Sequence, residues 1–267
     1  IKKLAGMFRV FRPILPLYAI PTTAGTGSEV TVAAVVSDPV THAKTPIMDP
    51  KVVPQMAALD GSLMTGLPAH ITAATGMDAL THAVEAYISA NAFEETDVCA
   101  IAATRLIMQN LETAVKDGSN IEARQNMALA SYYAGLAFTK AGVGYVHAIA
   151  HNFGAFYHTP HGLANAIVLP HVLDYSKDAS IERLAKLAEV SGLKKGKESK
   201  AQLAQMFIDK IRAMSKDFGI PSVLEDLKKT DIPSITKNAL KEAHYTYAVP
   251  KYMDQATCEN LIQKMIA

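Results

Sequence analysis

The chain has 267 residues, and 26 basic against 25 acidic side chains leave a net charge of +1. Hydrophobic residues make up 49% and charged residues 19%, a composition that supports a buried core and excludes a disordered or low-complexity chain. The near-zero charge argues against a nucleic-acid partner, because binding to phosphates depends on clustered Lys and Arg.

Cellular context also follows from composition. No apolar run is long enough to span a membrane, and the N-terminus lacks the pattern of a secretory signal peptide. The two cysteines, Cys99 and Cys258, have neither metal-site spacing nor the pattern of a disulfide framework. We therefore expect a cytoplasmic protein with no membrane partner. The first residue is Ile1 rather than Met, so we also expect an upstream portion.

Two regions with different patterns follow one another along the chain. In residues 1–62, short apolar runs at 17–20, 32–36 and 55–59 end at Pro, Gly, Asp or Ser-Asp-Pro, which is typical of buried strands. Residues 63–267 are rich in Ala, Leu, Ile and Met and have few helix breakers. We predict helices at 68–88, 94–116, 121–140, 144–157, 161–175, 180–191, 199–218 and 234–245. The domain boundary is expected within 61–67.

The first segment with chemical potential is residues 21–29, Pro-Thr-Thr-Ala-Gly-Thr-Gly-Ser-Glu, directly after a predicted strand. Small residues allow the backbone to approach a ligand, and the hydroxyls and amides can bind phosphate or ribose oxygens. The segment is neither a Walker loop nor a G-x-G-x-x-G motif. Taken alone, the signal is weak, because more than half of such Gly/Thr/Ser turns should be ordinary strand-to-helix connections.

Histidines and one aspartate recur at spacings that suit metal binding. Asp78 and His82 are four residues apart, as are His147 and His151, and His161 follows in a Pro-His-Gly motif. Side chains four apart share one face of a helix, so each pair could meet one ion. A carboxylate with several imidazoles suits Fe(II) or Zn(II). The alternative is that each histidine is a core residue bonded to a backbone carbonyl.

Three segments in order resemble the iron-containing (group III) alcohol dehydrogenases. They are residues 21–31, residues 76–87 (GMDALTHAVEAY) and residues 147–170 (HAIAHNFGAFYHTPHGLANAIVLP). The resemblance implies a dehydroquinate synthase-like fold, in which an α/β nucleotide-binding domain precedes an all-helical metal-binding domain. Here residues 1–62 would be the C-terminal part of the α/β domain, with its N-terminal part absent, and residues 63–267 the helical domain. The remaining strands would belong to a parallel sheet.

The same resemblance implies which residues form the site. The metal ligands would be Asp78, His82, His147 and His161, holding Fe(II), with Zn or Mn as alternatives. Spacing alone favours His147 with His151 as the second pair. The resemblance instead makes His151 a non-ligand that faces the nicotinamide and the substrate and passes a proton towards solvent.

Cofactor binding is assigned in the same way. Thr22, Thr23, Gly25 and Thr26 would line the pyrophosphate and nicotinamide ribose of NAD or NADP, and Lys44 corresponds to a cofactor-contacting lysine of the family. The substrate would be a short-chain alcohol or aldehyde. Phe153 and Phe156 are candidates for the wall of its pocket, and core packing is the alternative.

One departure from the family pattern is large. The Gly-Gly-Gly-Ser motif that wraps the pyrophosphate in this family occurs nowhere in the chain. A catalytically silent metal-binding domain is therefore a competing hypothesis, and a glycerol dehydrogenase or dehydroquinate synthase type of enzyme is another. The intact Pro-His-Gly motif at His161 favours the iron-type ligand set. By resemblance we expect a homodimer.

Overall fold

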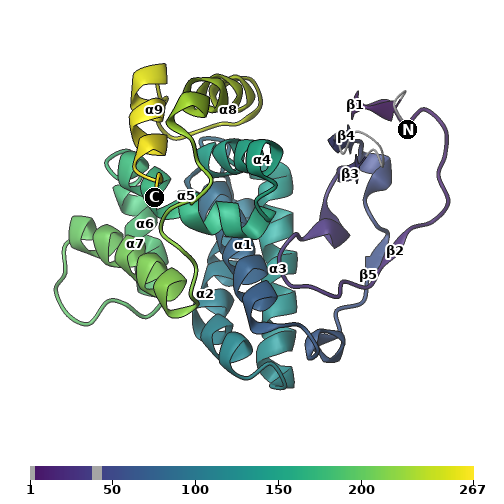
Figure 1. The fold of residues 1–267 in the computed structure, drawn as a ribbon. Coiled ribbons are helices and arrows are strands. Elements are labelled where there is room, and N and C mark those ends of the chain that lie inside the picture. The colour runs from purple at the N-terminus through teal and green to yellow at the C-terminus, as the bar shows by residue number, and fades with distance from the viewer. Residues whose placement is uncertain (1–3, 38–43) are drawn as a thin grey trace.

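The computed structural model describes residues 4–37 and 44–267. It consists of a small α/β region at the N-terminus and a larger region of packed helices (Figure 1). The α/β region lies beside α3 (Ile121–Ala141) in the helical part, and the chain crosses between the two regions through η4 (Gly61–Met64). This arrangement agrees with the predicted order of an α/β piece followed by an all-helical part.

Five short strands form two sheets in the described part of the α/β region. In one sheet, β4 (Lys44–Met48) lies between β1 (Gly6–Met7) and β3 (Ala33–Ser37); in the other, β2 (Tyr18–Ala19) pairs with β5 (Met56–Ala57). The β1–β4 and β2–β5 pairs are parallel. Many large apolar side chains of this region are exposed, including Phe11 at 85% and Leu15 at 87%.

The expectation of a purely parallel sheet is wrong at one pair. Strands β3 and β4 are antiparallel, with Ala33 opposite Met48 and Val36 opposite Thr45. Only six residues, 38–43, separate the two strands in the sequence. A parallel connection needs a crossover of about a dozen residues or more, so a separation this short is compatible only with an antiparallel neighbour.

The helices of the second region agree with their predicted positions to within one or two residues. One additional helix, the last, was not predicted. Their bounds are α1 (Ala69–Ile88), α2 (Glu94–Lys116), α3 (Ile121–Ala141), α4 (Tyr145–Tyr157), α5 (His161–Ser176), α6 (Ile181–Val190), α7 (Lys200–Asp217), α8 (Ile232–Thr246) and α9 (Gln255–Gln263).

Helix α1 is the centre of the helical region and packs against α2, α3 and α5. Every residue from Gly76 to Ile88 is buried, so the helix is enclosed on all faces rather than along one stripe. Three of these buried residues are Asp78, His82 and Glu85. Polar groups in such a place are costly unless they are paired, which makes this stretch a candidate for a functional site.

The connection between the two regions is fixed by Gln125 of α3. Its amide donates to the Leu59 carbonyl at 3.1 Å, and its side-chain oxygen accepts from the Gly61 N–H at 2.8 Å. Among the described residues, no helix has both the length and the apolar character needed to cross a membrane.

Candidate metal centre

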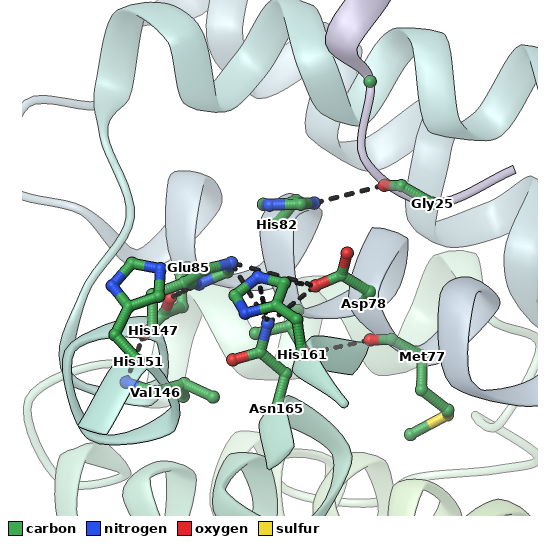
Figure 2. Close-up of polar contacts among 12 residues, drawn as sticks. Gly25, Met77, Asp78, His82, Glu85, Val146, His147, His151, His161 and Asn165 are labelled. Carbon is green, nitrogen blue, oxygen red and sulfur yellow. Dashed lines mark hydrogen bonds and ion pairs between the residues drawn. The ribbon is translucent and has the colours of Figure 1, made fainter. Parts of the chain in front are cut away.

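Three helices bring a carboxylate and two imidazoles together in the interior of the helical region. Asp78 comes from α1, His147 from α4 and His161 from the first turn of α5, and one ligand atom from each lies within 4.8 Å of the others (Figure 2). The Asp78 Oδ1 atom is 3.9 Å from His147 Nε2 and 3.5 Å from His161 Nε2. Asp78 and His147 are buried, whereas the His161 side chain is 34% exposed, so the group is open on the His161 side.

The approach of α5 to α1 depends on the glycine of the Pro-His-Gly motif. A Cβ atom at Gly162 would lie 2.3 Å from the Ala74 carbonyl oxygen and 3.4 Å from the Asp78 Cβ. Only a residue without a side chain permits this contact, and Ala74 is one turn before Asp78 on α1. The motif therefore places His161 beside Asp78 through backbone packing.

His147 is oriented by a second buried carboxylate, Glu85. The His147 Nδ1 atom is 2.6 Å from Glu85 Oε2, and the Val146 N–H donates to Glu85 Oε1 at 2.8 Å. Burial lowers the pKa of His147 well below its usual value, and burial raises the pKa of Glu85 while backbone N–H donors such as that of Val146 oppose the rise. His147 is therefore a neutral imidazole with one N–H and one lone pair.

The neighbours of His147 show which nitrogen carries the lone pair. The Asn165 Nδ2 atom, which can only donate, lies 3.2 Å from His147 Nε2. Nε2 is thus the acceptor, and the Nδ1–H donates to Glu85. A histidine whose second nitrogen donates to a carboxylate is the usual arrangement of a metal ligand.

His82 is not in the group of atoms within 4.8 Å, although the sequence predicts it as a fourth ligand. Its ring stacks between Phe138, at a centroid distance of 4.1 Å, and His147, at 4.6 Å. Its Nδ1–H donates to the Gly25 carbonyl at 3.3 Å, and burial lowers its pKa. The neutral ring therefore keeps a lone pair on Nε2 next to the group, and its role as a ligand stays a prediction.

His151 lies at the exposed edge of the group. Its side chain is 44% exposed, and its ring stacks on His161 at a centroid distance of 5.2 Å. The Nδ1 atom is 2.7 Å from Glu242 Oε1, which also accepts from the Tyr247 hydroxyl at 2.6 Å. The structure thus places His151 beside the group and joins it to helix α8.

The predicted cofactor segment runs past the metal centre. Thr22 and Thr26 are exposed, whereas Gly25 is buried and its carbonyl contacts His82. A Cβ atom at Gly25 would lie 2.8 Å from the Thr75 Cβ, so packing against α1 by itself accounts for this glycine. Thr23 is half-buried, and Lys44 begins β4, its side chain lying outside the described part of the structure. The cofactor contacts of these residues remain predictions.

The two phenylalanines have different surroundings. Phe153 is fully buried in the helical core, which favours the packing alternative over a role in a pocket wall. Phe156, on the last turn of α4, is 39% exposed and remains a candidate for the wall.

Three residues of the site were missed in the sequence. Glu85 and Asn165 each carried a signal, because Glu85 is seven residues after Asp78 on one helix face and Asn165 is four after His161. Glu242 carried none, since it is 91 residues from His151 and joins it only through the packing of α8 on α4.

The donor set fits a divalent transition metal, since a carboxylate and two imidazoles converge and a second partner, Glu85, fixes the tautomer of His147. The fold and the site together define a class: a helical metal-binding domain joined to a piece of an α/β domain. Comparison with known proteins identifies the particular family. Residues 72–266 match the C-terminal domain of the Fe-containing alcohol dehydrogenase family, and residues 2–61 match the iron-containing alcohol dehydrogenase model. The chain belongs to the iron-containing alcohol dehydrogenases.

Individual relatives are similar over most of the chain. The 1,3-propanediol dehydrogenase of Citrobacter freundii is 48% identical over 242 residues, 90% of this chain and 62% of the relative. The NAD-dependent methanol dehydrogenase of Bacillus methanolicus is 43% identical over 239 residues, 89% of this chain and 63% of the relative. A crystal structure of 1,3-propanediol oxidoreductase superposes with a TM-score of 0.94 at 43% identity and covers 99% of this chain and 70% of that one. The chain therefore spans less than two thirds of the length of the propanediol and methanol dehydrogenases that it matches.

Proposed function

We propose that the protein is a metal-dependent, NAD(P)-linked oxidoreductase that interconverts a short-chain alcohol and the corresponding aldehyde or ketone by hydride transfer. The observation that carries this proposal is the convergence of Asp78, His147 and His161 within 4.8 Å. Family membership supports it, as do relatives that are named propanediol and NAD-dependent methanol dehydrogenases.

The centre would be held by Asp78, His147 and His161, with His82 completing it through Nε2. Lewis-acid polarisation of the substrate's oxygen is the chemistry that a divalent cation supplies at such a donor set, and the hydride chemistry belongs to the nicotinamide. We propose Fe(II), and Zn or Mn are compatible with the same donors. Asp78 and His147 are buried, whereas His161 and His151 are partly exposed, so substrate would reach the centre from the side of His161 and His151.

Proton transfer is assigned to His151. Its Nδ1 atom is engaged by Glu242 at 2.7 Å, so Nε2 is the nitrogen that accepts the alcohol proton and passes it to solvent. The 44% exposure of the side chain gives that proton a direct way out. Thr22, Thr23, Gly25, Thr26 and Lys44 are proposed to bind NAD(H) or NADP(H), and the active form is proposed to be a homodimer.

The test is turnover by the 267-residue chain after anaerobic loading with Fe(II). We expect oxidation of NADH or NADPH in the presence of propanal, monitored at the nicotinamide absorbance. Asp78→Asn should abolish both metal retention and turnover, whereas Asp209→Asn, at an exposed carboxylate of α7, should leave both unchanged. Loss of neither property in Asp78→Asn would refute the proposed centre.

A second candidate is a metal-binding domain without turnover. It is favoured by the exposed apolar side chains of the described α/β region, such as Phe11 and Leu15. Calorimetric titration separates the two candidates. Metal bound in a one-to-one ratio with no binding of NADH or NADPH would support the second candidate and refute the first.

A further inference from the structure

Asn165 contacts the ligand atoms of all three residues in the candidate metal centre. Its side chain is fully buried on α5, and Nδ2 lies 2.6 Å from Asp78 Oδ1 and 3.2 Å from both His147 Nε2 and His161 Nε2 (Figure 2). The Oδ1 atom of the same amide is buried and has no hydrogen-bond partner among the described residues.

The amide is held in this orientation by its surroundings. Rotation by half a turn would place Oδ1 about where Nδ2 is, against the Asp78 oxygen, and two acceptors would then face each other. The same rotation would leave two N–H donors where Oδ1 has no partner. A buried donor or acceptor without a partner costs about 1–3 kcal/mol, and the observed orientation leaves only one such atom.

Electrostatically, the amide does at this point what a cation would do. It directs its two N–H hydrogens at a carboxylate oxygen and two imidazole nitrogens, which lie within 4.8 Å of one another. An imidazole lone pair cannot accept an N–H and bind a cation at once. The amide hydrogens and a cation therefore compete for the same lone pairs on His147 and His161.

We propose that Asn165 is a positioning residue that takes the place of the cation in the metal-free protein. In that state it holds the three ligand atoms together. A bound cation displaces the amide hydrogens from the two imidazoles, while the contact between Asn165 and Asp78 is kept. This inference rests on the proposed function, because it presupposes that the centre binds a metal.

The proposal has a thermodynamic consequence that a role in packing alone would not have. Leucine at position 165 has a similar volume but no donors, so it removes three contacts from the metal-free protein and one from the loaded protein. Because the metal-free state loses more, Asn165→Leu should bind Zn²⁺ more tightly, with a Kd about tenfold lower than wild type. The rise in Tm on adding Zn²⁺ should be larger than in wild type.

The experiment uses the full chain stripped with a chelator and titrated with Zn²⁺ alone, by calorimetry and by thermal melting. The matched control is Asn152→Leu, which removes a buried amide that donates to the Ala148 carbonyl at 2.9 Å. The control should lower Tm equally with and without Zn²⁺ and leave Kd unchanged. Should Asn165→Leu fail to fold, Asn165→Ala serves instead, since it also removes the donors and adds no charge, and Zn²⁺ should raise its Tm more than that of wild type.

Each outcome is decisive. An equal loss of Tm in both states, as in the control, or a Kd that is unchanged or higher in Asn165→Leu, would overturn the inference and leave the metal centre intact. Failure of wild type to bind Zn²⁺, Fe(II) or Co²⁺ would overturn the proposed function itself, before any variant is compared.

Discussion

Replacement of Glu85 by glutamine tests whether the tautomer of His147 is what makes the centre competent to bind metal. In the native protein, Glu85 accepts from the Val146 N–H with one oxygen and from His147 Nδ1–H with the other, at 2.8 and 2.6 Å. Glutamine has the same shape but only one acceptor atom. It can therefore accept from the Val146 N–H or from the His147 Nδ1–H, and not from both.

The two orientations of the glutamine have different costs. If its oxygen stays on Val146, its amide donates to His147 Nδ1 and the ring hydrogen moves to Nε2. That hydrogen would then face the Asn165 Nδ2 donor, 3.2 Å away, and no lone pair would remain for a cation. If the amide is reversed, its hydrogens oppose the Val146 N–H. Either way, metal binding has to overcome an unfavourable donor pair.

We expect the Kd for Zn²⁺ to rise about 10- to 100-fold in Glu85→Gln, the range for second partners of metal-bound histidines, which corresponds to about 1.4–2.8 kcal/mol. Competition with a chromophoric chelator measures this directly. The control is Glu242→Gln, because Glu242 makes the same bond to a histidine outside the ligand group, His151. An unchanged Kd in Glu85→Gln, or an equal rise in the control, would refute the role of the tautomer.

Three further outcomes are expected. Gly162→Ala should lower the free energy of unfolding by about 1–3 kcal/mol in urea melts and weaken Zn²⁺ binding, because its Cβ would meet the Ala74 carbonyl at 2.3 Å; unaltered stability would contradict the packing argument. Native Cys258 should not react with a thiol reagent at pH 8, since burial raises its pKa to about 12, whereas the half-buried Cys99 should react slowly. Hydrogen bonds from Ser62 lower the pKa of Asp60, so its stabilising contribution is complete above the unfolded pKa and is lost as pH falls through the folded value. The acid side of the stability curve should therefore be shallower in Asp60→Asn, and identical curves would contradict this.

The helices could be predicted because their signals are local. Helix α2 has the predicted bounds, 94–116, since acidic residues occupy its first turn and Asp117 and Gly118 follow its end. Helix α9 was missed although Asp254 caps it by accepting from the Thr257 N–H. It is short, with nine residues, and its apolar positions are few, so the periodic signal is weak.

The strands were harder to predict because their pairing is not local. Strand β4 contains Pro46, which argues against a strand inside a sheet, yet it lies between β1 and β3. Its register with β3, Pro46 opposite Val35, could not be read from either segment alone. The alternation of side chains with a period of two, in strands this short, gives little information about which strands are neighbours in the sheet.

At the site, the sequence indicated which residues could bind metal but not how their rings are turned. The spacing of Asp78 and His82 puts both on one face of α1, but a helical repeat does not predict the direction in which a side-chain ring points. The direction of the His82 ring is set by Phe138 and by the Gly25 carbonyl, both from other elements. Ligand identity is a sequence property, whereas ligand orientation is a property of the packed helices.

The contact between Gly25 and His82 joins two functions that the sequence presents separately. The carbonyl belongs to the predicted cofactor segment and fixes the Nδ1–H of a predicted metal ligand at 3.3 Å. The segment is held in turn by Ser131 of α3, whose hydroxyl accepts from the Gly27 N–H at 3.2 Å, and Gly27 has a positive φ of 58° with no room for a Cβ beside Gly135. A shift of this segment would therefore alter the direction of the His82 lone pair, so the predicted cofactor segment and the geometry of the centre are linked through one hydrogen bond.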